Sequence, residues 1–372
     1  MSAPLATARV RVDSSDRFDR CLDRFRTRFE EALLAFLASK RKRETGDPIG
    51  TPMVDAIESL VRAGGKRLRP ALVYHSYRLC GGRDDDRVMP LAMATELLHT
   101  YLLIHDDIMD HAETRRGSPA AHVRFRRQHD AARWPGDSTH FGRSIAILTG
   151  DLANTWATER YRQAVADVIE PEALSALDAT FAAMCEEVIH GQYLEMILPY
   201  ETDASESDVL AVLALKSGRY SCERPIELGG RLAGGGDEVL GPLVRFGKAI
   251  GEAFQIQDDI LGVFGDPDVT GKPVGSDLRE GKYTLLVHHT LRRSDSERGR
   301  RFSMLLGRAD LSDGEVHEAR EIIRASGGLE LVQAMIETRF VGAGSALEDL
   351  PRESDAFEFF AGLLDYLRDR EA

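Results

Sequence analysis

The sequence predicts an all-helical protein, and three observations support this prediction. Apolar residues recur at steps of three and four along most of the 372 residues. Turn signals rich in glycine and proline, such as Gly81-Gly82 and Gly265-Asp266-Pro267, separate many of these periodic stretches. No convincing segment alternates between apolar and polar residues, as a half-buried strand would. Because 43% of the residues are hydrophobic, the chain can also bury a large core.

The helices can be placed in chain order from this periodicity. We expect a flexible tail over residues 1–15, as at most chain ends, followed by one all-helical domain over 16–372. The first helix begins near Ser15, where Phe18 and Leu22 start an apolar stripe. The clearest internal loop is expected within 126–144. Further helices are expected at about 52–63, 69–80, 87–112, 118–130, 142–167, 171–197, 205–216, 218–232, 237–264, 282–292, 298–308, 313–325, 327–345 and 353–370.

Composition excludes several classes of function. A formal net charge of −13 argues against general binding to nucleic acid. The four cysteines are widely spaced without a CxxC pair, which fits a reducing compartment and gives no cysteine zinc site. No apolar run approaches the roughly 20 residues that cross a bilayer, and the N-terminus lacks the apolar core of a signal peptide. We therefore expect a cytoplasmic protein without stable membrane insertion.

Two acidic motifs, far apart in the sequence, interrupt apolar helical stretches. The first is Asp106-Asp107-Ile108-Met109-Asp110, within LLHTYLLIHDDIMD, and the second is FQIQDD, residues 254–259. Burying carboxylates among apolar residues is costly unless something compensates the lost solvation. A divalent cation does so, and Mg²⁺ in particular binds through one or two carboxylates together with substrate phosphates. The two motifs therefore indicate a diphosphate held through metal ions between two opposed helices.

Helical geometry distinguishes among the carboxylates of the first motif. On an ideal helix His99, Asp106 and Asp110 fall within an arc of about 40°, whereas Asp107 lies about 100° from Asp106. Asp106 and Asp110 are therefore the better metal pair, with Asp107 as their neighbour. The alternative interpretation is a solvated acidic helix face. The apolar run before the motif and Arg115-Arg116 after it argue against that interpretation.

The second motif offers Asp258 and Asp259, with Gln255 one turn earlier. A surface turn of helix is the alternative, but apolar residues on both sides of the motif argue against it. Basic segments could contribute to phosphate binding: Gly64-Gly65-Lys66-Arg67-Leu68-Arg69-Pro70, Lys216-Ser217, Lys272 and Lys282. Each of these alone is a weak signal, since an ordinary surface turn has the same composition.

Taken together and in order, these motifs resemble those of the trans-prenyl diphosphate synthases, the head-to-tail isoprenyl chain-elongating enzymes. The resemblance runs from about residue 64 to 284 through GGKRLRP, ELLHTYLLIHDDIMD, RRG, GDLA, GQYLE, KSGRY, FQIQDD and GKPVGSDLREGKYT. It implies an all-α, isoprenoid synthase-type helical bundle around a deep apolar central cavity, usually as a homodimer. The implied reaction condenses isopentenyl diphosphate with an allylic diphosphate (dimethylallyl, geranyl or farnesyl) by ionisation, condensation and elimination.

The resemblance also implies roles for individual residues. Asp106 and Asp110 become ligands of two Mg²⁺ ions and Asp258 the ligand of a third, with Asp107 and Asp259 in support; Mn²⁺ is a possible substitute. The residues implied to hold the allylic diphosphate are Arg115, Lys216, Ser217, Gln255 and Lys272. Those implied to bind isopentenyl diphosphate are Gly65, Lys66, Arg69, His99 and Arg116. Two more residues, Gln192 and Lys282, complete the implied substrate-binding set.

The sequence departs from the family pattern at three positions. Gly262 stands where the second motif usually ends in a third aspartate, so binding of the third metal would rest on Asp258 and on outer partners such as Asp266. Glu195 replaces the aspartate of GQxxD, which keeps the charge but moves it. Ser217 replaces a threonine and retains its hydroxyl group.

Product length depends on the residues just before the first motif, which form the cavity floor in this family. Tyr101 and Leu102 lie five and four residues before Asp106. An aromatic floor resembles the short-chain synthases, so we favour geranylgeranyl diphosphate (C20), with farnesyl diphosphate (C15) as the alternative. A simple core role for Tyr101 is nearly as attractive.

Two other functions compete with this interpretation. A class I terpene cyclase would share the fold, but GGKRLRP, Arg115-Arg116 and FQIQDD argue against it. A non-catalytic synthase subunit is disfavoured by the intact first motif, although Gly262 keeps it open. The part of the chain after about residue 290 carries no recognisable chemistry, and we expect it to serve packing.

Overall fold

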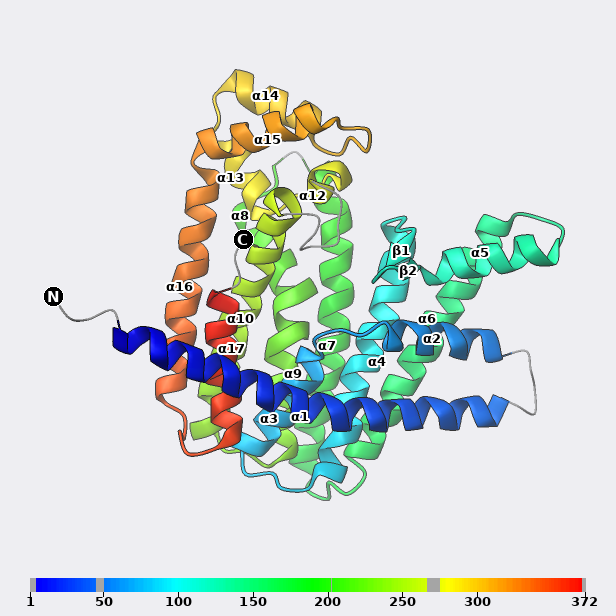
Figure 1. Ribbon diagram of the computed structural model, residues 1–372, viewed down its shortest axis with the longest axis vertical. Helices are drawn as coiled ribbons and strands as arrows, with labels where there is room; N and C mark the ends of the chain where they lie inside the picture. Colours follow the sequence, from blue (N-terminus) through cyan, green and yellow to red (C-terminus); the bar gives the residue numbers. More distant parts are fainter. Residues whose placement is uncertain (1–4, 45–49, 202, 266–274, 370–372) are drawn as a thin grey trace.

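The computed structural model describes residues 5–44, 50–201, 203–265 and 275–369, and this part of the chain is almost entirely helical (Figure 1). The predicted all-α fold class is therefore confirmed. The helices are α1 (Leu5–Glu44), α2 (Thr51–Arg62), α3 (Leu68–Leu79), α4 (Asp85–Met109), α5 (Ala121–Ala132), α6 (Ser138–Ala164), α7 (Pro171–Ile197), η1 (Leu198–Tyr200), α8 (Glu206–Val212), η2 (Leu213–Glu223), α9 (Arg224–Leu232), α10 (Asp237–Phe264), α12 (Ser276–Glu280), α13 (Leu285–Arg293), α14 (Ser296–Leu305), α15 (Asp313–Ser326), α16 (Gly328–Glu348) and α17 (Asp355–Arg368).

One small antiparallel ladder, β1 (Thr114–Arg115) and β2 (Ser118–Pro119), departs from the expectation of no strands. Its two central turn residues, Arg116 and Gly117, both have positive φ, at 52° and 73°. This is the turn that suits the twist of a tight hairpin. Strands of two residues are too short to produce an alternating pattern, which is why the sequence did not reveal them.

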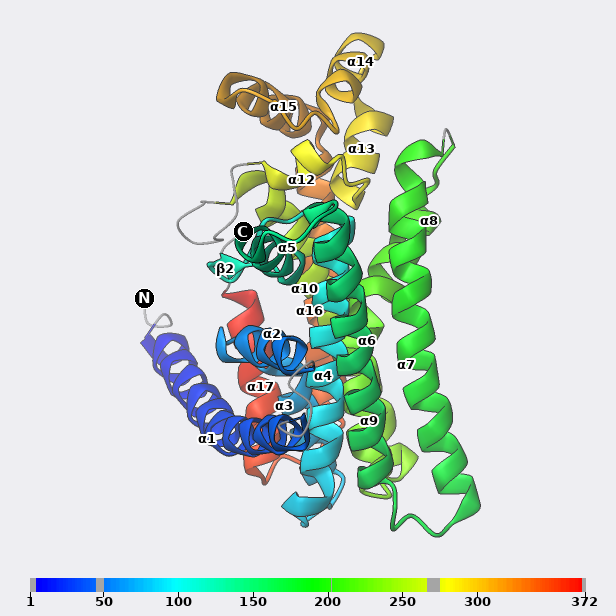
Figure 2. The ribbon, with the colours of Figure 1, turned by 90° about the vertical axis from the view of Figure 1, so that its right-hand side faces the viewer.

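The long helices form a bundle that encloses the central part of the molecule. Helix α4 packs on α6, α10 packs on both α16 and η2, and α7 packs on η2. Figure 2 shows α7 along the outer edge of the bundle, where α8 packs against it. Helix α1 lies across the bundle and packs against α17 (Figure 1). It begins at Leu5, within the stretch where a loose tail is expected.

The expected break between helices at residues 216–218 is wrong, because α8, η2 and α9 form one continuous helical run. Its middle, Leu213–Glu223, is a π-helix, a rare conformation that is frequent at functional sites. Gly218 is buried in this run instead of marking a turn. Helix α7 packs very closely against η2, since a Cβ atom at Gly191 of α7 would lie 2.3 Å from the backbone nitrogen of Lys216. The glycine of GQYLE is therefore required for this contact.

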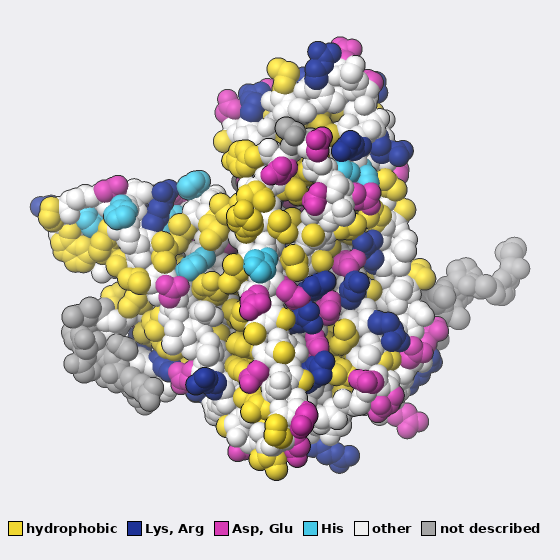
Figure 3. All heavy atoms as spheres, turned by 180° about the vertical axis from the view of Figure 1, so that it is seen from behind, with side chains coloured by type: hydrophobic (Ala, Val, Ile, Leu, Met, Phe, Trp, Pro, Cys, Tyr) yellow, Lys and Arg dark blue, Asp and Glu magenta, His cyan; other side chains and the backbone are white. Residues whose placement is uncertain are grey.

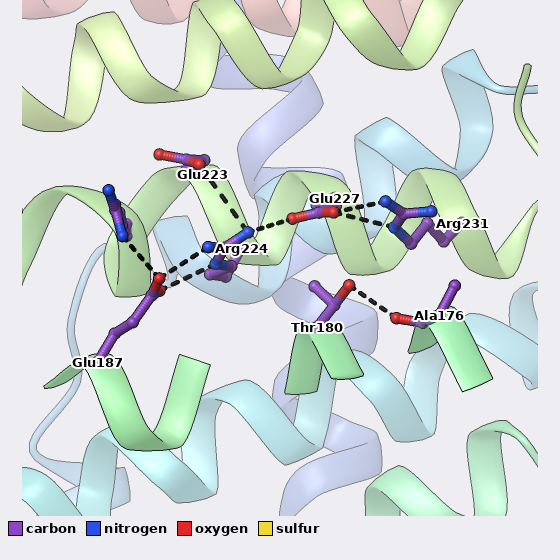
Figure 4. A network of polar contacts seen from close by, with 8 residues as sticks. Ala176, Thr180, Glu187, Glu223, Arg224, Glu227 and Arg231 are labelled. Atoms are coloured by element: carbon purple, nitrogen blue, oxygen red, sulfur yellow. Dashed lines mark hydrogen bonds and ion pairs between the residues drawn. The ribbon is translucent and has the colours of Figure 1, made fainter. Parts of the chain in front are cut away.

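Ion pairs hold α7 against η2 and α9 (Figure 4). Glu187 of α7 accepts hydrogen bonds from Arg219 (2.8 Å) and from two nitrogens of Arg224 (2.9 and 2.7 Å). Arg224 also donates to Glu227 at 2.6 Å, and Glu227 in turn accepts from Arg231. Because the pairs are partly buried and linked, they constrain the π-helical segment more firmly than isolated surface pairs would.

The loop expected within 126–144 is present and short, because α5 continues to Ala132 and α6 begins at Ser138. The polar residues that suggested a loop form the exposed side of α5, which projects from the bundle (Figure 1). Asp137 caps α6 by accepting hydrogen bonds from the backbone nitrogens of Thr139 (2.8 Å) and His140 (3.2 Å). Within the described residues, no helix has both the length and the apolar character needed to cross a bilayer.

Candidate active site

The first acidic motif occupies the C-terminal end of α4. The helix ends in a Schellman arrangement, in which His111 has a φ of 53° and the Ala112 nitrogen donates to the Asp107 carbonyl at 2.9 Å. The chain then reverses into the β1–β2 hairpin, which returns Arg115 to the helix. Arg115 Nε donates to Asp107 Oδ1 at 2.7 Å, and the Asp107 side chain is only 2% exposed. The Asp107–Arg115 pair therefore fastens the hairpin to α4.

Asp106 and Asp110 lie one helical turn apart and face other charged groups. Burial, and then the negative charge of Asp106, raise the pKa of Asp110 to about 6. Lys216 Nζ of η2 lies 3.6 Å from Asp106 Oδ1 and forms an ion pair with Glu195 of α7. Although burial alone would lower the pKa of Lys216, these two carboxylates outweigh it and raise the pKa. The structure thus brings Asp106, Asp110 and Lys216 together.

The second acidic motif lies on α10. Gln255 Nε2 donates to Asp259 Oδ1 at 2.8 Å, one helical turn away. Burial raises the pKa of Asp259 to about 8, and the nearby charge of Asp277 acts in the same direction. Lys282 also belongs to this group: burial opposes its charge, but Asp277 and other carboxylates outweigh burial and raise its pKa.

Asp277 is not among the site residues predicted from the sequence. Its carboxyl group lies where the side chain of a third aspartate, at position 262, would start. A Cβ atom built at Gly262 would lie 2.0 Å from Asp277 Oδ2 and 2.3 Å from its Cγ. Asp277 is 5% exposed and belongs to α12, in the segment GSDLREGKYT. A carboxyl group from a different element therefore occupies the space that Gly262 leaves. Asp266, which the sequence suggested as a partner, lies outside the described residues.

Two connected chambers lie between these motifs. The first, of about 400 Å³, is lined mainly by apolar residues of α4 and α7, with η2 and Arg69 of α3 at its side. The second, of about 270 Å³, is polar and is lined by Asp258, Asp259, Asp277 and Lys282 among others. Both chambers share Leu103, Asp106, Lys216 and Ser217. An apolar chamber therefore adjoins a charged one at these four residues.

The polar chamber is chemically suited to magnesium. Its acidic side chains offer oxygen donors, which are the ligands that Mg²⁺ prefers. Carboxylates gather there in spite of burial, and the raised pKa of Asp259 expresses the cost of that arrangement. A divalent cation would remove this cost, so the residues fit the group that the sequence analysis implied.

A second cluster of predicted residues surrounds Tyr220 of η2. Arg69 lies over the Tyr220 ring at 4.5 Å from its centroid and donates to Ser221 Oγ at 2.7 Å. His99 Nδ1 is hydrogen bonded to the Tyr220 hydroxyl group. Burial, followed by the charges of Arg69 and Arg116, holds the pKa of His99 well below its usual range. His99 is therefore neutral within a positively charged wall of the apolar chamber.

The other basic residues bind protein groups. Lys66 Nζ contacts the hydroxyl group of Tyr366 in α17 and lies 4.9 Å from the centroid of its ring. Arg116 donates to the carbonyl groups of Gly64 and Leu60. Its guanidinium also lies 3.0 Å from the Cβ position of Gly65. Lys272 lies outside the described residues. Tyr220 and Tyr366 are contacts that motif matching alone could not supply.

Tyr101 and Leu102 line the apolar chamber together with Gln192 of α7. At a rise of 1.5 Å per residue, Tyr101 lies about 7.5 Å along α4 from Asp106. Its ring packs edge-on against His105 at a centroid distance of 4.7 Å. The position is compatible with a floor and also with a packed aromatic side chain.

Comparison with known proteins agrees with this architecture. A model of the polyprenyl synthetase family matches residues 51–323. A short chain isoprenyl diphosphate synthase of Methanothermobacter thermautotrophicus is 35% identical over 90% of this chain and 96% of its own. A geranylfarnesyl diphosphate synthase of Aeropyrum pernix is 34% identical over 84% and 92%, respectively. A geranylgeranyl pyrophosphate synthase of Corynebacterium glutamicum, solved with isoprenyl diphosphate and magnesium, superposes with a TM-score of 0.86 at 32% identity, covering 94% of this chain and 99% of that one.

The helical bundle, with two acidic motifs beside an apolar chamber, defines an isoprenoid synthase-type protein. The chain belongs to the polyprenyl synthetase family, and it is a prenyltransferase.

Proposed function

We propose that this chain is a Mg²⁺-dependent synthase that condenses isopentenyl diphosphate with an allylic diphosphate to give a short-chain trans-prenyl diphosphate, geranylgeranyl diphosphate. The observation that carries the proposal is the junction of the two chambers at Asp106, Lys216 and Ser217. An allylic diphosphate has a charged head and an apolar tail. It could place its head among the carboxylates and lysines and its tail against α4 and α7.

The reaction would begin when the allylic carbon–oxygen bond breaks and its electron pair leaves with the diphosphate. Bound Mg²⁺ would supply positive charge to the departing group. Lys216 and Lys282 line the same chamber and would stabilise that charge from the protein side. Because such groups are fixed before the reaction starts, they need no reorganisation as charge develops.

The alkene of isopentenyl diphosphate would then attack the allylic cation and form the new carbon–carbon bond. Loss of a proton to the released diphosphate restores a double bond and completes the balance of charge. Arg69 and His99 lie together on the wall of the apolar chamber, and they could hold the second diphosphate beside the cation. The apolar lining would keep water away from the cation.

The proposed product length rests on Tyr101. Its ring lies at the chamber wall about five residues' rise from the first motif, where it could stop a growing chain. The relatives include both geranylgeranyl and geranylfarnesyl diphosphate synthases.

A homodimer is part of this proposal. Large apolar side chains are exposed on α6 and α7: Ile147 (45%), Leu148 (54%), Ile189 (51%), Tyr193 (62%) and Met196 (51%). Figure 3, seen from behind, shows hydrophobic side chains gathered across the middle of the surface. The three α7 residues also line the apolar chamber. A second copy on this face would bury them and close the chamber.

The test is product analysis of the purified chain with Mg²⁺ and isopentenyl diphosphate, offering dimethylallyl, geranyl and farnesyl diphosphates in turn. We expect a C20 product that Asp106→Ala abolishes. Asp310→Ala, at a side chain 81% exposed, is the matched control and should leave the product unchanged. A C15 product would contradict the proposed C20 product length but not the proposed reaction. Absence of elongation with every primer would reject the proposed reaction, and release of a hydrocarbon from one primer would indicate a cyclase.

A further inference from the structure

Three side chains of metal-binding type converge outside the two chambers. Glu206 lies in the first turn of α8, and His288 and His289 are consecutive residues of α13. Each offers one ligand atom, an imidazole nitrogen or a carboxylate oxygen, and these three atoms lie within 4.8 Å of one another. The residues are more than 80 positions apart in the sequence, so the packing of α8 on α13 brings them together.

The two histidines are buried with imidazole nitrogens that none of the described residues satisfies. His288 is 5% exposed and His289 is 7% exposed. Neither His288 Nδ1 nor His289 Nε2 has a hydrogen-bond partner in the described part of the chain. Buried polar atoms nearly always have a partner, so two such nitrogens on consecutive residues require an explanation.

The third member of the cluster is exposed. Glu206 lies at the surface, and its carboxylate adds an oxygen ligand to the two imidazoles.

We propose that Glu206, His288 and His289 form a site for a first-row transition cation of the Zn²⁺ type. Two imidazoles and one carboxylate are a known protein ligand set for zinc, with water in the fourth position. At metal–ligand distances of about 2.0–2.2 Å the ligand atoms must lie roughly 3.4 Å apart, so a small closure of the cluster would suffice. The site is chemically distinct from the aspartate chamber, because imidazole favours Zn²⁺ over Mg²⁺.

A cation there would join two segments that approach the polar chamber from different parts of the chain. Helix α8 leads directly into η2, which carries Lys216 and Ser217. Helix α13 begins directly after Lys282, Tyr283 and Thr284, and all five residues line the chamber. Metal binding at the junction of α8 and α13 would therefore stabilise both walls without touching the substrates.

Zinc binding can be measured on the full chain after removal of metals, in millimolar Mg²⁺, by competition with a chromophoric chelator. The background is Asp106→Ala/Asp110→Ala, which removes zinc binding by the first aspartate motif. We expect one equivalent of Zn²⁺ in this background and its loss after His288→Ala or His289→Ala. Removing even an outer partner of a metal ligand weakens binding about 10–100-fold, so we expect Glu206→Gln to cost tenfold or more.

The controls separate loss of ligands from loss of fold. Glu206 is exposed, so Glu206→Gln preserves the shape of the surface and tests the site even if a histidine variant misfolds. His190→Ala, at an exposed histidine of α7, should leave zinc binding unchanged. At the same Zn²⁺ concentration, the thermal midpoint of the background protein should rise more than that of Glu206→Gln. The proposal would be overturned if the background protein bound no equivalent of Zn²⁺. It would also be overturned if Glu206→Gln bound Zn²⁺ with the same affinity as the background protein. Synthase activity enters none of these measurements, so they stand or fall independently of the proposed reaction.

Discussion

The contact between Gly262 and Asp277 leads to a prediction that can be worked out from distances. A Cβ atom at position 262 would lie 2.0 Å from Asp277 Oδ2, whereas ordinary van der Waals contact begins at 3.4 Å. The carboxyl group would have to move by roughly 1.4 Å, within an interior where Asp277 is 5% exposed. Overpacking of this kind costs about 1–3 kcal/mol, so Gly262→Ala should lower the free energy of unfolding by that amount.

The same geometry predicts that the two positions can exchange roles. Asp277→Ala removes a carboxyl group beside Asp259 and should raise the Mg²⁺ concentration for half-maximal binding by about 10–100-fold. Gly262→Asp alone adds a second carboxylate to space that is already filled, so it should destabilise the protein at least as much as Gly262→Ala. The double variant Gly262→Asp/Asp277→Ala removes the carboxyl group of residue 277 and places a new carboxyl group, carried by α10, in the same space. It should therefore recover most of the lost stability and Mg²⁺ affinity.

The assay is a double-mutant cycle measured by urea unfolding and by calorimetric titration with Mg²⁺ and an unreactive diphosphate. Residues in direct contact show coupling energies of about 0.5–3 kcal/mol, and we expect a value toward the upper end, with the double variant more stable than the sum of the singles. Gly241→Ala is the matched control on α10, because its Cβ would meet only a side-chain atom of Arg245 at 3.7 Å. It should be neutral or slightly stabilising.

Two results would refute this reasoning. Additive effects of the two substitutions, within about 0.5 kcal/mol, would mean that Asp277 does not occupy the space of a side chain at position 262. Unchanged Mg²⁺ binding in Asp277→Ala would mean that its carboxyl group does not substitute for the third aspartate of the motif.

Three further predictions concern the chamber, the core and the surface. Tyr101→Ala should lengthen the product seen by chromatography, and an unchanged length would exclude a floor at this residue. Arg67→Met should lower the free energy of unfolding in urea by about 3–5 kcal/mol, since it leaves the buried Glu96 carboxylate unpaired; a loss below 1 kcal/mol would contradict that. Leu148→Arg places a charge on the exposed apolar face, so it should convert a dimer to a monomer in sedimentation, and an unchanged dimer would place the interface elsewhere.

Local sequence information was sufficient for most of the helices. The spacing of apolar residues in α4, for example, predicts that the segment is helical. A helix of 3.6 residues per turn then places Asp107 on a different face from Asp106 and Asp110. The structure agrees: Asp107 is buried against Arg115, while Asp106 approaches Lys216. Boundaries were predicted less well. Gly218 suggested a break because glycine often marks one, yet here it packs inside a continuous helix.

The sequence by itself determined the helical class, the position of each motif on its helix and the membership of the ordered motif set in one family. These properties depend on neighbours within a few turns or on the order of residues along the chain. Tertiary structure alone decided that Asp277 lies against Gly262, that Tyr220 joins Arg69 to His99, and that Glu206 meets two histidines. Such meetings depend on how distant helices pack, and helical periodicity carries no information about which partner a buried face will contact.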